Sequence, residues 1–246
     1  LKKFQRHSQL SQKKLEELKL NLASTLPHEL RTPLNGIVTS TQFISDYIDN
    51  LDKDEIRQIN RSIHQSSQRL KKLILNYLFF VEIQMLYKDD GNKQKLKQFT
   101  TDSPEIIIET VLNQLSAEYD DNNYEYHEID DCRIAMMEEH FFKITEELID
   151  NAFKFAKPQS DIIVDGFSND LFYNLKVKNF GRGMTDEQIK NISAYVQFDR
   201  KKYEQQGSGL GLAIVKSLVE IYEGRFHIDS VPGEYTEIEI NIPLSK

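Results

Sequence analysis

The stretch DEIRQINRSIHQSSQRLKKLILNYLFFVEIQM, residues 54–85, carries the most regular pattern in the chain. Its mainly apolar positions recur in alternating steps of three and four, which is the spacing of a coiled-coil seam. Only the polar Ser66 interrupts the series, whose members are Ile56, Ile59, Ile63, Ser66, Leu70, Leu73, Tyr77 and Phe80. The pattern predicts a long helix that buries one side against other helices.

A second helix is expected upstream, because apolar residues again share one side of a helical pattern. They are Ile37, Ile44, Tyr47 and Leu51, and Asn50 and Asp52 supply turn chemistry before residue 54. One such hairpin has too little core to stand alone, so we expect two hairpins to pair as a four-helix bundle in a homodimer. The alternative is a single long hairpin that packs on the second domain of its own chain.

The N-terminal segment is polar, with Leu15, Leu18 and Leu22 at coiled-coil spacing. We expect residues 1–20 to be a helical linker from an upstream sensor or receiver module, since the sequence starts without Met or a signal-peptide pattern. Residues 21–90 then form the hairpin and residues 91–246 a second domain, with a hinge predicted at Asp89–Asn92.

The second half alternates strand-like and helix-like segments. Ser103 and Pro104 are typical of a helix start, and a further helix is expected at Glu138–Phe155. Strands are expected at Tyr124–Ile129, Cys132–Ala135, Asp161–Phe167, Leu171–Lys178, Arg225–Ser230 and Tyr235–Ile242. The fold class is therefore multidomain: a helical hairpin forming a dimeric four-helix bundle, then an α+β sandwich with an antiparallel-looking sheet.

Composition narrows the function. The formal net charge is -8 and the sequence pI is about 5.4, which argues against nucleic acid as a partner, since duplex binding relies on Lys and Arg. No apolar run is long enough to span a bilayer. Cys132 is the only cysteine, which favours a reducing cytoplasm for this part of the protein.

Residues 26–34 read LPHELRTPL and contain a histidine followed directly by a carboxylate. Glu29 can accept a proton from one ring nitrogen of His28, which makes the other nitrogen a better nucleophile. Thr32 lies one helical turn beyond His28, where its hydroxyl can orient a water. Pro33 removes a helical hydrogen bond and predicts a bend. Alternatively, His28 is an ordinary surface histidine.

The string from His28 to Leu34 closely resembles the phosphoacceptor box of sensor histidine kinases over seven consecutive residues. The resemblance implies that His28 is phosphorylated, that Glu29 is the base, and that Thr32 serves the reverse phosphatase reaction. The other histidines receive no assigned chemistry.

Residues 146–155 read EELIDNAFKF, and on a helix Glu147, Asn151 and Lys154 share one face. This string resembles a box of the ATP-binding fold shared by histidine kinases, gyrase, Hsp90 and MutL. The resemblance implies that Glu147, Asn151, Lys154 and Phe155 bind the nucleotide, with Asn151 and Glu147 on Mg²⁺, which prefers oxygen ligands. The alternative is an amphipathic surface helix with ordinary charges.

Residues 179–184 read NFGRGM, which resembles the family's Asp-x-Gly-x-Gly box with Asn179 in place of the Asp. The family's Asp accepts a hydrogen bond from the adenine amino group. An Asn oxygen can still accept that bond, but without charge assistance. Gly181 and Gly183 leave backbone room for the base.

Two further segments resemble the lid and phosphate loop of that fold. Glycines before a helix let backbone N–H groups approach phosphates at the positive end of the helix dipole. By resemblance, the lid residues are Phe198, Arg200 and Lys201, and the phosphate loop contributes Gly207, Gly209, Leu210, Gly211 and Leu212.

The resemblance implies a protein histidine kinase that uses ATP and Mg²⁺ to phosphorylate His28 and passes the phosphoryl group to an aspartate of a response-regulator receiver domain. Three alternatives stay open. Asn179 favours a degenerate module that acts mainly as a phosphatase or binds a regulator. The others are a MutL- or gyrase-like ATPase acting on nucleic acid and a structural coiled-coil protein.

Overall fold

The computed structural model describes residues 26–88, 90–119, 123–130, 132–194 and 210–245. These residues fall into two compact units. Along the chain, the boundary lies within one long helix, between Phe79 and Phe80. The first unit holds a helical hairpin and the second an α+β domain. The predicted linker, with Leu15, Leu18 and Leu22, lies outside the described residues.

The hairpin consists of a helix over residues 26–47 and of α2 (Lys53–Lys88). The predicted seam of α2 is confirmed, because its members are buried or half-buried while the residues between Ile56 and Leu70 that lie off the seam are exposed. The helix over 26–47 stays helical through Pro33, so the proline does not end it.

The turn between the two helices is held by Asp52. Its Oδ1 accepts hydrogen bonds from the backbone N–H groups of Asp54 and Glu55, each at 2.8 Å. Glu55 Oε2 in turn accepts from the N–H of Asp52 at 2.9 Å. This reciprocal pair satisfies donors that the first turn of α2 leaves unpaired, and it confirms the turn predicted from Asp52.

The break in the seam at Ser66 has a packing reason. A Cβ added to Gly36 would lie 2.8 Å from Ser66 Oγ, so the two helices approach closely where both carry a small residue. Ile37, Ile44 and Leu51 are half-buried as expected. Tyr47, predicted on the same side, is 50% exposed in the single hairpin and packs on Phe43 of its own helix.

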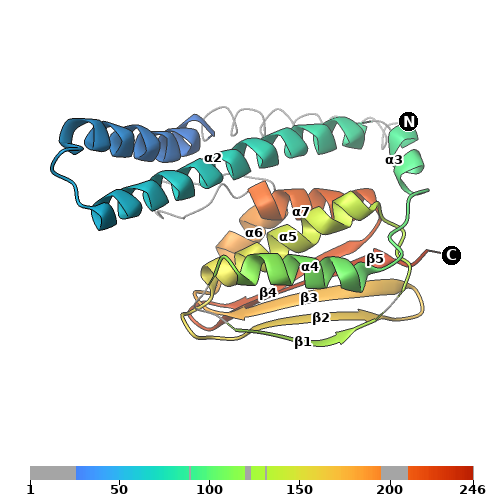
Figure 1. Cartoon of the computed structure of the whole chain (residues 1–246). Helices are drawn as coiled ribbons and strands as arrows, with labels where there is room; N and C mark the ends of the chain where they lie inside the picture. The colour runs from blue at the N-terminus through green and yellow to red at the C-terminus, as the bar shows by residue number, and fades with distance from the viewer. Residues whose placement is uncertain (1–25, 89, 120–122, 131, 195–209, 246) are drawn as a thin grey trace. The chain divides into compact units, whose positions relative to one another are not determined.

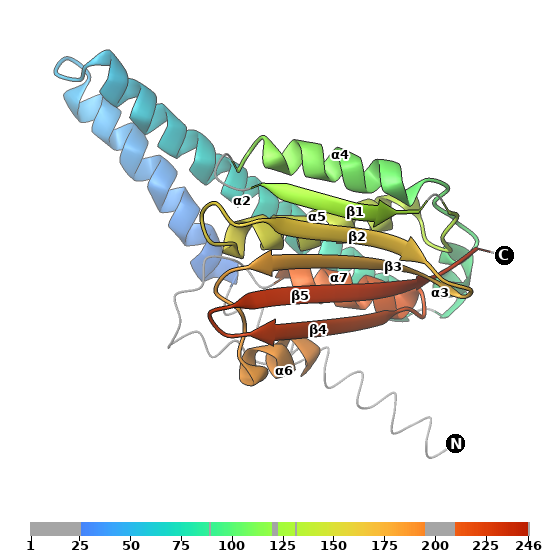
Figure 2. The same cartoon turned by 90° about the horizontal axis from the view of Figure 1, so that it is seen from below.

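In the second unit, helices cover one face of a sheet (Figures 1 and 2). Its helices are α3 (Asp90–Leu96), α4 (Pro104–Ser116), α5 (Glu138–Phe155), α6 (Asp186–Ala194) and α7 (Leu210–Ile221). Its strands are β1 (Tyr124–Ile129), β2 (Ile162–Ser168), β3 (Phe172–Phe180), β4 (Arg225–Val231) and β5 (Tyr235–Pro243). In Figure 1, α4, α5 and α7 lie above the sheet.

In the described part, the sheet has five strands in the order β1-β2-β3-β5-β4. The prediction of an antiparallel sheet is wrong for one pair, because β1 and β2 are parallel. The reason is α5, which carries the chain back across the sheet before β2 begins, as parallel strands require. The other three pairs are antiparallel.

The inward face of the sheet changes character along the strands. Across β2, β3, β5 and β4, one inward row is wholly apolar: Val164, Val177, Ile238 and Ile228. The row at the end of β3 reads Ile162, Asn179, Thr236 and Ser230, and is mostly polar. Polar side chains on the helix-covered face point to a site rather than to core.

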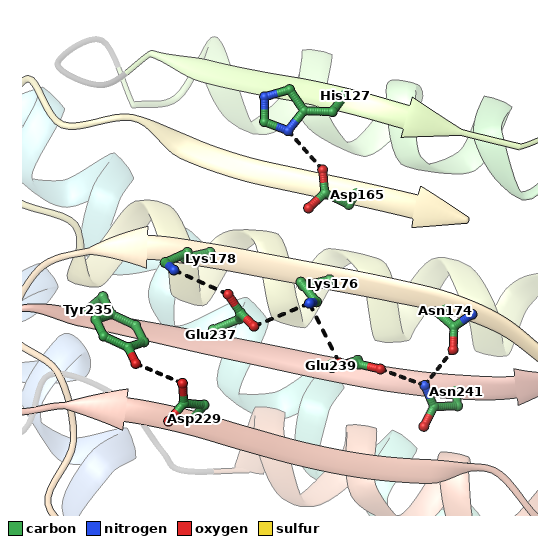
Figure 3. A network of polar contacts seen from close by, with 10 residues as sticks. All are labelled: His127, Asp165, Asn174, Lys176, Lys178, Asp229, Tyr235, Glu237, Glu239 and Asn241. Carbon is green, nitrogen blue, oxygen red and sulfur yellow. Dashed lines mark hydrogen bonds and ion pairs between the residues drawn. The ribbon is translucent and has the colours of Figure 1, made fainter. Parts of the chain in front are cut away.

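The outward face carries a polar network (Figure 3). Lys178 Nζ lies 3.3 Å from Glu237, and Lys176 reaches both Glu237 and Glu239 at 3.4 and 3.8 Å. On the neighbouring strands, His127 Nδ1 lies 3.0 Å from Asp165 Oδ1. Such cross-strand pairs suit a solvent-facing surface, and they contrast with the apolar inward rows.

One predicted strand differs from the structure, and the predicted hinge falls partly within a helix. Cys132–Ala135 is not a strand: only Ile134 forms bridges, to Thr101 and to Leu244, so the segment meets each neighbour for a single residue. At the predicted hinge, Asp90, Gly91 and Asn92 belong to α3, and Asp89 lies outside the described residues. The helix penalty of glycine, about 1 kcal/mol, does not prevent a helix there.

Candidate functional site

The first part of the site lies at the start of the described hairpin. His28 is exposed on the helix over 26–47, and Glu29 beside it is half-buried. The hydroxyl of Thr32 donates to the backbone carbonyl of His28 at 3.4 Å, so the two residues occupy the same side of the helix, one turn apart. An exposed imidazole with an adjacent carboxylate and a nearby hydroxyl is free to meet a second domain.

The second part is built on α5 and α7. The helix α5 has the bounds that the sequence predicts. A Cβ added to Gly211 would lie 2.1 Å from Glu147 Oε2 and 3.7 Å from Asn151 Nδ2. A side chain at Gly211 would displace the Glu147 carboxylate, so glycine lets the first turn of α7 lie close to the predicted metal residues on α5.

Glu147 is buried and paired with Lys143, which was not among the predicted site residues. Lys143 Nζ lies 2.8 Å from Glu147 Oε1. Burial by itself would lower the pKa of Lys143, but the carboxylates of Glu147 and Glu146 outweigh it and the pKa is raised. Lys143 therefore stays charged and fixes the Glu147 carboxylate. In the sequence, the four-residue spacing of Lys143 and Glu147 on one helix face could have predicted this ion pair.

The C-terminal end of α5 is joined to the loop after β3. Gly181 bridges Ala156, and the N–H of Lys157 donates to the carbonyl of Phe180 at 2.8 Å. A Cβ added to Gly181 would lie 1.9 Å from the carbonyl oxygen of Phe155, so only glycine fits. These contacts bring Asn151 and Phe155 to the same end of the domain as Asn179.

The next glycine of the loop has a backbone reason. Gly183 has a φ of 65°, and a Cβ there would lie 2.1 Å from the carbonyl oxygen of Val231. The N–H of Met184 donates to Ser230 Oγ at 2.8 Å, and the N–H of Gly233 donates to the carbonyl of Arg182. The loop is therefore braced against the turn between β4 and β5.

Phe155 is half-buried and is approached by two cations. Lys154 Nζ and Arg182 Cζ each lie 5.3 Å from the centre of its ring. Lys154 belongs to α5 and Arg182 to the glycine loop, so the positive charge at this end of the domain comes from both segments. Of the two cations, Lys154 is the predicted phosphate contact, and its positive charge suits that role.

Asn179 faces inward from β3 and is 5% exposed. Its Nδ2 has no hydrogen-bond partner among the described residues. A buried amide donor without a partner costs about 1–3 kcal/mol, so Asn179 is a candidate ligand contact.

The remaining predicted residues divide into two groups. Leu210 and Leu212 are buried in the first turn of α7. Phe198, Arg200, Lys201, Gly207 and Gly209 lie outside the described residues. Within the described ranges, no three His, Cys, Asp or Glu side chains gather as a metal cage. Magnesium that binds through one or two protein oxygens and substrate phosphates needs no such cage, and Glu147 with Asn151 fits that requirement.

The two parts of the site match two protein-family models. "His Kinase A (phospho-acceptor) domain" matches residues 18–86, and "Histidine kinase-, DNA gyrase B-, and HSP90-like ATPase" matches residues 136–246. The described residues define a phosphoacceptor hairpin followed by an ATP-binding domain. The chain belongs to the sensor histidine kinases, of which it carries the phosphoacceptor and ATP-binding domains.

Named relatives agree with this assignment. The chain is 31% identical to the aerobic respiration control sensor protein ArcB homolog of Haemophilus influenzae, covering 82% of this chain and 61% of that protein. It is 26% identical to the sensor histidine kinase YvrG of Bacillus subtilis, covering 96% and 40%. It therefore spans only part of these relatives' length.

A solved structure shares the fold. The histidine kinase AdeS of Acinetobacter baumannii superposes with a TM-score of 0.62 at 17% identity, covering 89% of this chain and 98% of that one. No helix in the described ranges is long and apolar enough to cross a membrane.

Proposed function

We propose that this protein phosphorylates itself on His28 with ATP and then passes the phosphoryl group to an aspartate of a response-regulator receiver domain. The observation that carries the proposal is that one chain contains both features. One unit has the exposed His28 beside Glu29, and the other has Glu147 and Asn151 packed against Gly211. Neither feature has a use in a purely structural coiled coil, and the net charge of -8 disfavours an ATPase acting on nucleic acid.

The first step is a displacement at the γ-phosphorus. A ring nitrogen of His28 forms the new bond to phosphorus, the bond from phosphorus to the bridging β–γ oxygen breaks, and ADP leaves. Glu29 holds the proton of the other ring nitrogen and stabilises the cationic ring as it forms. Phosphoryl transfer depends mainly on positioning and charge stabilisation, so the protein's main task is to align His28 with the nucleotide.

The nucleotide is assigned to the second unit. Asn151 and Glu147 are the proposed protein ligands of Mg²⁺, which would offset the negative charge of the phosphates. Lys154 and the backbone around Gly211 and Leu212 are the proposed phosphate contacts, together with Leu210. Phe155, Asn179, Gly181 and Gly183 are proposed to enclose the base. We retain Phe198, Arg200, Lys201, Gly207 and Gly209 as proposed lid and loop contacts.

A second activity is favoured by Thr32. Its hydroxyl lies one turn from His28 on the same side of the helix, as its hydrogen bond to the His28 carbonyl indicates. There it can orient a water for attack on the acyl phosphate of a docked receiver domain, which releases inorganic phosphate. A protein whose ATP site is weakened by Asn179 would act mainly in this direction or as a regulator-binding module.

The partners follow from the hairpin. We propose a homodimer in which two hairpins form a four-helix bundle, because large apolar side chains stay exposed on the single hairpin. They include Leu34, Val38, Phe43, Ile74, Leu75 and Leu78, each more than 40% exposed. We also retain an upstream sensor or receiver module, the domain limits at residues 20 and 90, and a cytoplasmic location, which the use of ATP supports.

The kinase proposal is tested by label transfer from γ-labelled ATP in the presence of Mg²⁺. Asn151→Ala removes a proposed metal ligand, and the incorporated label should fall by about 100-fold, as when one group that stabilises transition-state charge is lost. Asn113→Ala, an exposed amide on α4, is the matched control and should label as the wild type does. Full labelling of Asn151→Ala would overturn the proposed donor site.

A further inference from the structure

Asn179 stands at the point where the inward face of the sheet becomes polar. Its neighbours across the strands are Ile162 on β2 and Thr236 on β5. Thr236 is already satisfied, since its hydroxyl lies 2.9 Å from Ser230 Oγ. In this row, the unused hydrogen-bonding capacity therefore belongs to the Asn179 amide.

The orientation of that amide is set by close packing. Gly181 passes beside it, because a Cβ there would lie 2.9 Å from Asn179 Nδ2. The side chain is 5% exposed and Nδ2 has no partner in the described part of the chain. The donor is thus held at the wall of the proposed base pocket without a protein acceptor, and a bound base that offers an acceptor removes the penalty.

An amide and a carboxylate select different bases. A carboxylate only accepts hydrogen bonds, so it pairs with the 6-amino group of adenine and repels the 6-oxo group of guanine or hypoxanthine. An amide also donates. It can accept from the 6-amino group while donating to N1 of adenine, or donate to a 6-oxo group while accepting from the N1–H that accompanies it.

We propose that Asn179 broadens the pocket to 6-oxopurine nucleotides, so that the site takes inosine and guanosine triphosphates as well as ATP. The inference deepens the proposed function and rests on it, because it assigns a wider substrate class to the same site. The amide can pair with a 6-aminopurine or with a 6-oxopurine, so the site should discriminate less between these two classes of base. A site with a single pattern of buried hydrogen bonds rejects the wrong base strongly.

The test is competition against an ATP analogue with a fluorescent group on its ribose, using the full chain and unlabelled ATP, ITP and GTP. ITP carries a 6-oxo group and an N1–H where ATP has a 6-amino group and an unprotonated N1. GTP shares these features of ITP and adds a 2-amino group. We expect ITP to compete with the wild type within about tenfold of ATP, since both edges find their partners. In Asn179→Asp, the ITP-to-ATP ratio of dissociation constants should rise by at least about tenfold.

The control is Asn174→Asp on the same strand. Asn174 is also buried, but its Nδ2 donates to the carbonyl of Phe167 at 3.0 Å and its Oδ1 accepts from Asn241 at 2.7 Å. It faces the outward surface, so its substitution changes β3 in charge without changing the pocket. The ITP-to-ATP ratio of this variant should equal that of the wild type.

Each other outcome has a separate meaning. If the wild type binds ATP but binds ITP as weakly as the Asn179→Asp variant, the inference is overturned. The kinase proposal then still stands. An equal shift in Asn174→Asp also overturns it. If the fluorescent analogue does not bind the wild type at all, the proposed ATP site fails and the inference fails with it. If Asn179→Asp does not fold, the wild-type ratio alone decides.

Discussion

At the residue scale, His140 shows what periodicity cannot convey. The sequence places it on α5 with no assigned chemistry, yet the structure buries it to 6% exposure with Nδ1 2.8 Å from the hydroxyl of Tyr222. Burial lowers the pKa of His140, against a smaller opposing effect of Glu139. Burial also raises the pKa of Tyr222 to about 12, so the hydroxyl keeps its proton. The pair is neutral and structural.

This pair predicts a loss of stability in mild acid. The unfolded histidine has a pKa near 6.5 and the folded one titrates lower, so the unfolded chain binds the proton first as the pH falls. The stability that neutral, buried His140 contributes is therefore fully present above the unfolded pKa of about 6.5, and it declines as the pH falls below that value. Urea unfolding at about pH 7.5 and about pH 5.5 should show a smaller loss of free energy in His140→Gln than in the wild type. His227→Gln, an exposed histidine on β4, should keep the wild-type loss; equal losses in all three proteins would contradict the account.

The predicted site residues show a similar division. The sequence identified Glu147, Asn151 and Asn179 because motif chemistry and helical spacing are local signals. It missed Lys143, whose role depends on burial beside Glu147. It also missed the unpaired Nδ2 of Asn179, since whether a buried amide has a partner depends on strands far apart in the sequence.

At the element scale, β2 and β3 pack around a crowded contact. Tyr173 is fully buried and its hydroxyl has no hydrogen-bond partner in the described ranges. A Cβ added to Gly166 would lie 2.2 Å from that hydroxyl and 3.2 Å from Tyr173 Cζ. The glycine therefore makes room for the phenol oxygen rather than for the ring.

We predict opposite effects from two substitutions here. Gly166→Ala should destabilise the domain by about 1–3 kcal/mol, because the methyl group overlaps the phenol oxygen in a close-packed core. Tyr173→Phe should be neutral or stabilising, since it removes an unpaired buried hydroxyl. Thermal and urea unfolding of both single variants and of the double variant measure the coupling. Additive effects in the double variant would show that the oxygen is not the obstacle.

Helices and strands were predictable where the signal lies within their own sequence. The seam of α2 and the bounds of α5 follow from apolar spacing, and both are confirmed. The segment Cys132–Ala135 was misassigned because its residues favour a strand, while pairing depends on what lies beside them. The parallel pairing of β1 and β2 was missed because strand direction is set by the intervening α5.

At the scale of the whole molecule, the division into a hairpin and an α+β domain was predictable, since the hydrophobic period changes between the two halves. The resemblance of both halves to one family supplied the proposed function. Pairing between copies was inferred only from the small core of one hairpin, and it remains a proposal. The exposed apolar side chains of the hairpin support it.

The most direct test of the central proposal is label transfer from γ-labelled ATP to the wild type, His28→Ala and His64→Ala. His64 is a second exposed histidine of the hairpin unit, on α2, so it controls for loss of an imidazole as such. We predict equal labelling of the wild type and His64→Ala and no label on His28→Ala, because His28 alone carries the adjacent Glu29 and the nearby Thr32. Label that survives His28→Ala would contradict the assignment of the phosphoacceptor.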